Sequence, residues 1–273
     1  MSDGPLISVV TVVYNGVRFL SETIESVLAQ EGVNLEYWVI DGGSGDGTVE
    51  IIQRHSAGLT GWISESDQGI SHAFNKGVER SRGTYVMLLN ADDALAHRHS
   101  LAELLRHASD SQWPDVIYGD CDLHDPDSGA FLYRAVVEYQ RERFLRGRAL
   151  PHPGMLMHQR YFERYGRFDL SFKVAMDYEL FLRGIPSVGA VRAPVLVSRV
   201  RAGGISARNR ALAADETIRA LRMHGHLGRA GEWRMRAAYV ARAAVRRGLE
   251  RAGLYSFFDS WRRRRSGQVG WLN

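Results

Sequence analysis

The stretch TYVMLLNADDAL, residues 84–95, decides the fold. Its apolar run at 85–89 is typical of a buried strand, and the run ends abruptly in Asn90, Asp92 and Asp93. Adjacent carboxylates repel each other unless a positive group lies between them, and a hard cation such as Mg²⁺ or Mn²⁺ readily takes such oxygens. Alternatively, Asp92 caps the following turn and Asp93 is solvated, as acidic pairs in loops commonly are.

Upstream of this strand, apolar runs alternate with segments of helical periodicity. We expect strands at 6–13, 36–41, 61–66 and 84–89, and helices at 17–30, 45–55 and 70–83. Asp46 is the expected N-cap of the second helix, and Gly83 is the expected stop of the third. This alternation predicts an α/β fold with a mostly parallel, doubly wound sheet, in which ligands bind at the carboxyl ends of the strands.

The alternation loosens after residue 95. We expect a helix at 100–109, a strand at 115–120, a hairpin or loop at 122–150, short helices at 160–166 and 176–184, a strand at 193–200, and helix from about 209 to near the end. No segment is rich enough in Pro, Gly or Ser to mark a firm domain boundary.

Size and composition indicate a soluble globular protein. The chain has 273 residues, 45% of them apolar and 24% charged, which suits one large domain or a domain with an appendage. The single cysteine, Cys121, excludes an internal disulfide framework and a cysteine-based metal cluster. We expect Cys121 to be an inert core residue in a cytoplasmic protein with no secretory signal and no membrane-spanning helix.

Positive charge is concentrated at the C-terminal end. Residues 225–273 hold eleven arginines against three acidic residues, so this tail carries +8 and the remainder −4 of a net charge of +4. Trp261, Phe257 and Phe258 lie beside four consecutive arginines at 262–265, a mixture typical of helices on anionic membrane surfaces. A solvated helix that packs its aromatic residues on the domain is the alternative. Nucleic-acid binding is not expected, because no motif supports it.

The glycine-rich segment DGGSGDGT, residues 41–48, permits tight turns and close approach of the backbone to a ligand. It is neither a Walker-type phosphate loop nor a dinucleotide fingerprint. Asp41 is therefore either a turn former or a hydrogen-bonding partner for a nucleotide base.

Three segments together resemble the family-two inverting glycosyltransferases in order and spacing. They are ISVVTVVYNGVRFLSETIESVLAQ at 7–30, VIDGGSGDGT at 39–48 and ESDQGISHAFNKGVERSRGTYVMLLNADD at 65–93, with a weaker similarity at 151–183. The chain looks like the small bacterial enzymes that decorate glycolipids, exopolysaccharides and lipid-linked surface glycans.

The resemblance implies a GT-A fold and a division of the chain. Residues 1–205 would form the catalytic domain, with 1–95 as the nucleotide-sugar half and 96–205 as the acceptor half. Residues 206–273 would form a helical, basic extension. The partners would be a nucleotide-diphosphate sugar and a glycan or glycolipid acceptor at the cytoplasmic face of the bacterial inner membrane.

The resemblance also implies roles for particular residues. Donor binding falls to Val12, Tyr14, Asp41, Asp67, Lys76, Asn90 and Asp92. Asp93, with Asp92, would hold Mg²⁺ or Mn²⁺ at the diphosphate. Asp177 would be the general base, with Glu179 as the alternative, and His152 would either touch the diphosphate or metal or serve as a structural hydrogen-bonding residue.

These residue types suit an inverting transfer, which is a single displacement. A carboxylate takes the proton of the attacking hydroxyl, and a metal neutralises the leaving diphosphate. Two departures from the family concern substrate recognition: His72 stands where the family often has Asp, and PHP at 151–153 stands where it often has CHQ. Two other hypotheses are a nucleotidyltransferase, for which the Gly-rich basic loop is missing, and a membrane-associated scaffold with a degenerate transferase fold.

Overall fold

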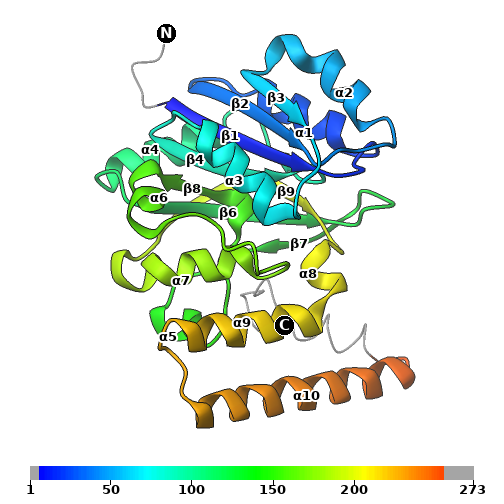
Figure 1. Cartoon of the computed structure of the whole chain (residues 1–273), viewed down its shortest axis with the longest axis vertical. Helices are drawn as coiled ribbons and strands as arrows, with labels where there is room; N and C mark the ends of the chain where they lie inside the picture. The colour runs from blue at the N-terminus through cyan, green and yellow to red at the C-terminus, as the bar shows by residue number, and fades with distance from the viewer. Residues whose placement is uncertain (1–5, 255–273) are drawn as a thin grey trace.

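The computed structural model of the chain describes residues 6–254 (Figure 1). The expected tail aromatics and the four consecutive arginines at 257–265 lie outside the described residues.

The N-terminal half is a parallel sheet with helices on both faces. Its strands are β1 (Leu6–Val13), β2 (Asn34–Asp41), β3 (Gly61–Ser64) and β4 (Tyr85–Asn90), in the order β3-β2-β1-β4. The intervening helices are α1 (Leu20–Leu28), α2 (Thr48–His55, followed by the short turn η1, Ser56–Gly58) and α3 (Ile70–Arg80). The sequence prediction of this half is confirmed in element type and order.

Both faces of the central strand β1 are buried, which explains its unbroken apolar sequence. Val10 and Val12 pack in the cluster that includes α3, while Val9 and Val13 pack in the cluster beneath α1. A close approach joins α3 to the sheet, because a Cβ atom on Gly77 would lie 2.1 Å from Cγ1 of Val10. Glycine at this position lets the helix pack directly on the strand.

Several predicted helix boundaries are wrong, and α1 begins at Leu20 rather than at residue 17. The N-cap of α2 is Gly47 at φ 99°, and Asp46 precedes it, its carboxylate accepting the backbone N–H of Thr48 from outside the helix. The helix α3 ends at Arg80, three residues before Gly83, and the hydroxyl of Ser81 closes its last turn by donating to the carbonyl of Gly77.

The second half extends the sheet with mixed strand directions. The added strands are β5 (Ala94–Leu95), β6 (Val116–His124), β7 (Phe131–Ala135), β8 (Met155–His158) and β9 (Val191–Arg201), continuing the order as β4-β8-β6-β9-β5 with β7 on β6. The helices are α4 (Ser100–Asp110), α5 (Arg141–Phe144), α6 (Gln159–Tyr165) and α7 (Met176–Val188), and a short turn η2 (His152–Gly154) precedes β8. The region expected as hairpin or loop thus contains β7 and α5, and α7 is longer than predicted.

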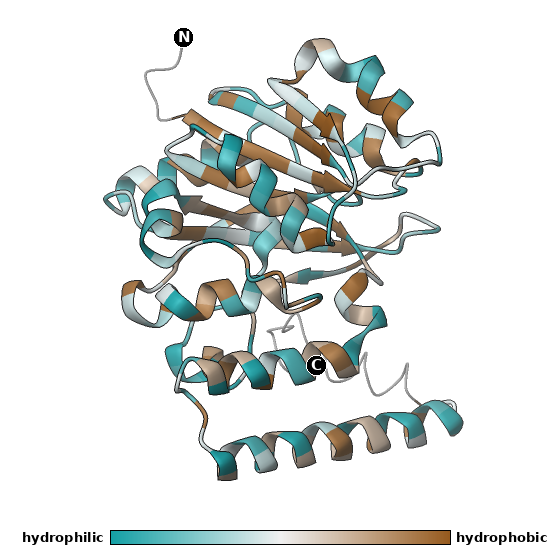
Figure 2. Cartoon of the chain, viewed as in Figure 1, coloured by the Kyte–Doolittle hydropathy of each residue, from teal (hydrophilic) through white to brown (hydrophobic). Residues whose placement is uncertain are grey.

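Three helices follow the sheet: α8 (Ile205–Arg208), α9 (Arg210–Met223) and α10 (Arg229–Arg251). The helix α9 packs on α7, and α10 lies along α9 as an outer layer (Figure 1). Strands of the sheet are mostly hydrophobic, whereas α10 mixes hydrophilic and hydrophobic residues along its length (Figure 2). No described residue of α10 is buried, and within residues 6–254 no helix has the length and apolar character needed to cross a membrane.

Candidate active site

The parallel register brings the polar strand ends to one edge of the sheet. Val12 of β1 pairs with Ile40 of β2 on one side and with Asn90 of β4 on the other. Residues immediately after these positions therefore meet at a common rim, as the sequence predicted. The side chain of Val12 itself is buried in the core, so only its backbone can face a ligand.

The two acidic residues after β4 differ in their environments. Asp93 is only 2% exposed, whereas Asp92 is partly exposed. Burial and the neighbouring charge of Asp92 raise the pKa of Asp93 to about 7, and burial also raises the pKa of Asp92. The interpretation of Asp93 as a solvated loop residue is wrong. Two neighbouring carboxylates of this kind oppose each other's ionisation, and a bound cation would offset that cost.

A chain of polar contacts leads from this acidic pair to Asp177. Nδ2 of Asn90 donates to Oδ2 of Asp93 at 3.2 Å and lies 3.2 Å from Nε2 of His152. Nδ1 of His152 lies 3.3 Å from Oδ2 of Asp177, in the first turn of α7. Residues from β4, η2 and α7, more than 80 positions apart at the extremes, therefore form one site.

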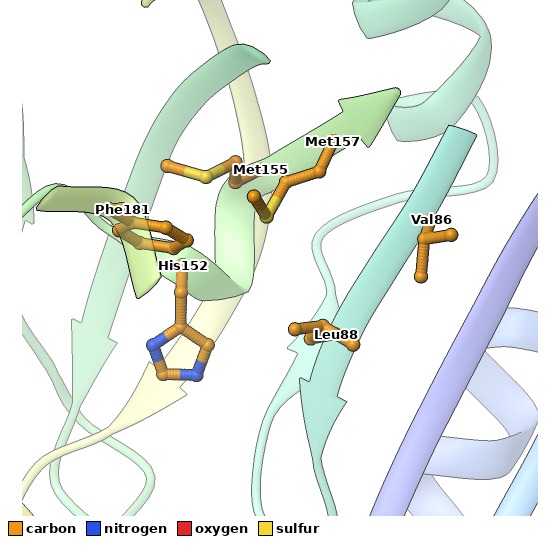
Figure 3. A pocket seen from close by; sticks show the side chains of 6 residues that line it. All are labelled: Val86, Leu88, His152, Met155, Met157 and Phe181. Carbon is orange, nitrogen blue, oxygen red and sulfur yellow. The ribbon is translucent and has the colours of Figure 1, made fainter. Parts of the chain in front are cut away.

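Histidine 152 is held between carboxylates at the base of the site. Burial lowers its pKa, but the hydrogen bond and charge of Asp177, with the charges of Asp93 and Asp92, outweigh burial, and the pKa is raised. Its apolar surroundings come from two strands and a helix, with Phe181 of α7 beside the imidazole (Figure 3). His152 and these apolar side chains line a small pocket, whose residues are His152, Val86, Leu88, Met155, Met157 and Phe181. His152 thus connects the two halves of the site.

The residues around Asp93 suit a hard divalent cation. Within residues 6–254 no group of three or more His, Cys, Asp or Glu could enclose a metal on its own. The site instead offers the carboxylates of Asp92 and Asp93 and the buried Oδ1 of Asn90, which has no hydrogen-bond partner among the described residues. Mg²⁺ usually takes only one or two protein carboxylates, with water and substrate phosphates as its other ligands. The residues therefore fit a metal that is completed by a diphosphate.

Asp41 forms the turn after β2. Its carboxylate accepts the backbone N–H groups of Gly43 at 3.1 Å and Ser44 at 3.0 Å, and also the hydroxyl groups of Ser44 and of Ser64. Asp41 is fully buried. The structure therefore favours the turn-forming interpretation, and hydrogen bonding of Asp41 to a nucleotide base stays a prediction.

Tyr14 and Asp67 meet at Gly42. A Cβ atom on Gly42 would lie 2.6 Å from Oδ2 of Asp67 and 3.4 Å from the ring of Tyr14, so only glycine permits this approach. Tyr14 is 68% exposed, and Oδ1 of Asp67 accepts the N–H of Gly69. An exposed aromatic ring beside a carboxylate, at the strand ends, is a suitable surface for a nucleoside.

Lys76 is more enclosed than a surface helix lysine. It is buried, and its Nζ lies 2.9 Å from Oε1 of Glu65 and donates to the carbonyl of Ser66. The lysine thereby holds the loop between β3 and α3, which contains Asp67. His72, the first departure from the family pattern, accepts the N–H of Gln68 in the same loop through Nδ1.

Glu179 is not available as the general base. Its carboxylate is fully buried, and Arg183 and Nε2 of His224 bind it, the latter at 2.7 Å. A carboxylate that is bound by a guanidinium and an imidazole and is removed from solvent cannot receive a proton from an acceptor. Asp177 remains as the carboxylate of α7 that reaches the site, since its side chain is 21% exposed.

Arg201 is a site residue that the sequence did not reveal. Its Nη1 donates to the backbone carbonyl of Asp92 at 2.7 Å, its guanidinium pairs with Glu22 and stacks 4.0 Å above Phe19. The arginine therefore fixes the turn that carries the acidic pair. In the sequence, only its position at the end of a predicted strand could have indicated a site residue. Its partners Asp92 and Glu22 lie 109 and 179 positions away.

The arrangement is that of a GT-A glycosyltransferase: a nucleotide-binding sheet with an acidic pair at its rim and a carboxylate opposite. TarS of Staphylococcus aureus in complex with UDP-GlcNAc superimposes with a TM-score of 0.66 at 15% identity, over 88% of this chain and 72% of that chain. The mannosyltransferase PcManGT of Pyrobaculum calidifontis, in complex with GDP-Man and Mn²⁺, gives a TM-score of 0.60 at 20% identity over 94% and 80%.

Sequence comparison defines the family. Residues 8–166 match the model of glycosyl transferase family 2, and the chain belongs to this family. A PGL/p-HBAD biosynthesis glycosyltransferase of Mycobacterium bovis is 25% identical over 96% of this chain and 99% of its own length. An uncharacterized glycosyltransferase of Mycobacterium tuberculosis is 29% identical over 67% of this chain and 70% of its own.

The raised pKa of Asp93 predicts a pH-dependent effect of Asp93→Asn in the absence of metal. Folding favours the protonated carboxyl, so its contribution to stability is complete below the ordinary pKa of 3.8 and is lost as the pH rises through about 7. Because asparagine does not ionise, Asp93→Asn should raise Tm by several degrees at pH 8 and by clearly less at pH 5, measured with EDTA present. An equal change in Tm at both pH values would contradict the claim that folding raises the pKa of Asp93.

Proposed function

We propose that this protein is an inverting, metal-dependent glycosyltransferase. It moves a sugar from a nucleotide-diphosphate sugar to a hydroxyl group of a lipid-linked or surface-glycan acceptor. The observation that carries the proposal is the chain of contacts that connects Asp177 through His152 and Asn90 to Asp93.

Asp177 is the proposed general base. It stands in the first turn of α7, and one of its oxygens contacts His152. A carboxylate in this position can take the proton of an acceptor hydroxyl as that hydroxyl attacks the anomeric carbon. The proposed role of His152 is to orient Asp177 and to contribute positive charge beside the diphosphate.

Asp93 and Asp92 are the proposed ligands of Mg²⁺ or Mn²⁺, and the metal would neutralise charge on the leaving diphosphate. Asn90 orients Asp93 through its amide group. Arg201 keeps the turn in place by binding the carbonyl of Asp92. One structurally similar protein is in complex with UDP-GlcNAc, and another is in complex with GDP-Man and Mn²⁺. These complexes support a nucleotide-sugar donor and a divalent metal, but they do not decide between uracil and guanine as the nucleobase.

The proposed nucleoside surface consists of Tyr14 and Asp67, which both lie close to Gly42. Asp41 and Lys76 would stabilise the loops that carry these two residues. Tyr14 supplies an exposed ring for stacking on a base. Asp41 and Lys76 shape the loops through their hydrogen bonds and ion pair. These contacts give the two buried residues a supporting role in donor binding.

The helix α10 is the proposed contact with the cytoplasmic face of the bacterial inner membrane. Trp233, Ala237, Val240 and Ala244 follow helical spacing on one exposed face, and Trp233 and Val240 are 78% and 66% exposed. The opposite face contacts the domain through Met235 and Tyr239, which approach Gly147. Arginines at 229 and 247 flank the apolar face, and each contributes about 1 kcal/mol at an anionic surface.

The donor site is tested by a thermal-shift panel of UDP, GDP, dTDP and CDP, each with and without Mn²⁺. We expect one nucleotide to stabilise the wild type by about 2.7 kcal/mol at a hundredfold excess over Kd, only with metal. Asp93→Ala should abolish this stabilisation, because it removes the proposed metal ligand. Asp110→Ala, an exposed carboxylate on α4, is the control and should behave as wild type. A flat panel for the wild type would count against the transferase and favour a non-catalytic scaffold.

Membrane binding is tested by sedimentation with vesicles of phosphatidylglycerol and phosphatidylcholine. The double substitution Trp233→Ser and Val240→Ser should weaken partition about tenfold, because it removes apolar surface that enters the interface. Phe131→Ser, at a residue 57% exposed on β7, is the matched control and should have no effect. Unchanged partition of the double variant would show that the outward face of α10 does not contact the membrane.

A further inference from the structure

The segment before Asp177 is held by a carboxylate from α9. Oε1 of Glu216 accepts the backbone N–H of Lys173 at 2.8 Å, and Oε2 accepts those of Val174 and Ala175, each at 2.8 Å. Glu216 is only 4% exposed. These three N–H groups immediately precede α7, whose second residue is Asp177.

This contact is strong and directional. The N–H groups at the beginning of a helix lack partners within the helix, and an anion there also interacts favourably with the helix dipole. Bonds to an ionised acceptor are about twice as strong as neutral ones, and a buried carboxylate is stable only where such donors surround it. Three bonds from a single side chain therefore fix the position and the direction of the first turn of α7.

The same segment has further contacts on both sides. From α9, Nη2 of Arg219 donates to the carbonyl of Ser171 at 2.9 Å, and its guanidinium lies 3.8 Å from the ring centroid of Phe172. From α3, the hydroxyl of Ser71 donates to the carbonyl of Phe172 at 3.0 Å. The segment that leads to Asp177 is thus held between α9 and the donor half of the sheet.

We infer that Glu216 is a positioning residue for transfer, one that fixes the carboxylate of Asp177 where it meets the acceptor hydroxyl. The inference rests on the proposed function, in which Asp177 is the base. It gives α9 a part in catalysis although α9 contributes no side chain to the rim of the sheet. A displacement of about 1 Å at a reacting group can lower a rate a hundredfold, so loss of these three bonds should act on turnover.

A second buried contact between α9 and α7 provides the control. Nε2 of His224, the C-cap residue of α9 eight positions beyond Glu216, lies 2.7 Å from Oε1 of Glu179, which follows Asp177 on α7. This contact joins the bodies of the two helices without touching residues 173–175. His224→Ala should therefore lower stability without moving Asp177.

The experiment compares full-length wild type with Glu216→Gln, Glu216→Ala, Arg219→Ala and His224→Ala. Release of nucleoside diphosphate is measured with UDP-GlcNAc, UDP-glucose, GDP-mannose and dTDP-rhamnose in the presence of Mn²⁺, with water as the acceptor. For the donor that the wild type turns over, we expect kcat to fall about tenfold in Glu216→Gln and about a hundredfold in Glu216→Ala. Arg219, which is exposed, can be truncated without disturbing the core, and a severalfold loss is expected.

Binding and exchange measurements separate positioning from a general structural role. The Kd of the nucleoside diphosphate should stay within about twofold of wild type in every variant, since the donor surface is unchanged. Amide hydrogen exchange at 173–175 should accelerate in the Glu216 variants alone. His224→Ala should lose Tm and keep kcat.

Three results would overturn the inference. Unchanged kcat in Glu216→Ala and Arg219→Ala would show that the contacts do not position the base. A loss of kcat in His224→Ala equal to that in Glu216→Gln, at equal loss of Tm, would show a merely structural role. A wild type that binds no nucleotide and releases no nucleoside diphosphate overturns the proposed function itself, and this inference falls with it.

Discussion

The burial of Asp93 beside a second carboxylate is the constraint on which the rest of the site depends. Burial and the charge of Asp92 both oppose ionisation of Asp93, as its raised pKa shows. The fold maintains this placement by binding the turn from several sides. Arg201 binds the carbonyl of Asp92, and the hydroxyl of Thr23 lies 2.7 Å from the carbonyl of Asp93. A turn held this firmly keeps the two carboxylates together, as the proposed binding of a cation and a diphosphate requires.

The same constraint explains how the two halves of the chain cooperate. Asn90 contacts Asp93 with its amide and reaches His152, and His152 reaches Asp177. The parallel half of the sheet supplies the acidic pair, and the later, mixed half supplies the histidine and the carboxylate opposite. The charges of the acidic pair and of Asp177 together keep the pKa of His152 raised despite burial. In the proposed function, donor and acceptor chemistry would therefore be linked through one imidazole.

Local sequence patterns predicted most of the parallel half of the sheet. Apolar strand runs, helical spacing and polar strand ends are all properties of residues that are neighbours in the sequence. The acidic pair at the end of β4 was visible for this reason, whereas Asp177 was assigned only through resemblance to a family. Predictions failed where distant contacts decide. Nothing in the local sequence indicates that Glu65 and the loop before α3 enclose Lys76. Likewise, the contact of Glu216 with 173–175 spans about forty positions and has no local signal.

The most direct test of the account replaces Asp177 with asparagine, which keeps the shape of the side chain and removes its basicity. The configuration of the new glycosidic bond is followed by NMR, together with kcat and metal-dependent nucleotide binding. The account predicts inversion at the anomeric carbon in the wild type, and in Asp177→Asn normal nucleotide binding with kcat lower by about 10²–10⁴-fold. Retention of configuration, or an Asp177→Asn variant with nearly full turnover, would contradict the assignment of Asp177 as the base of an inverting transfer.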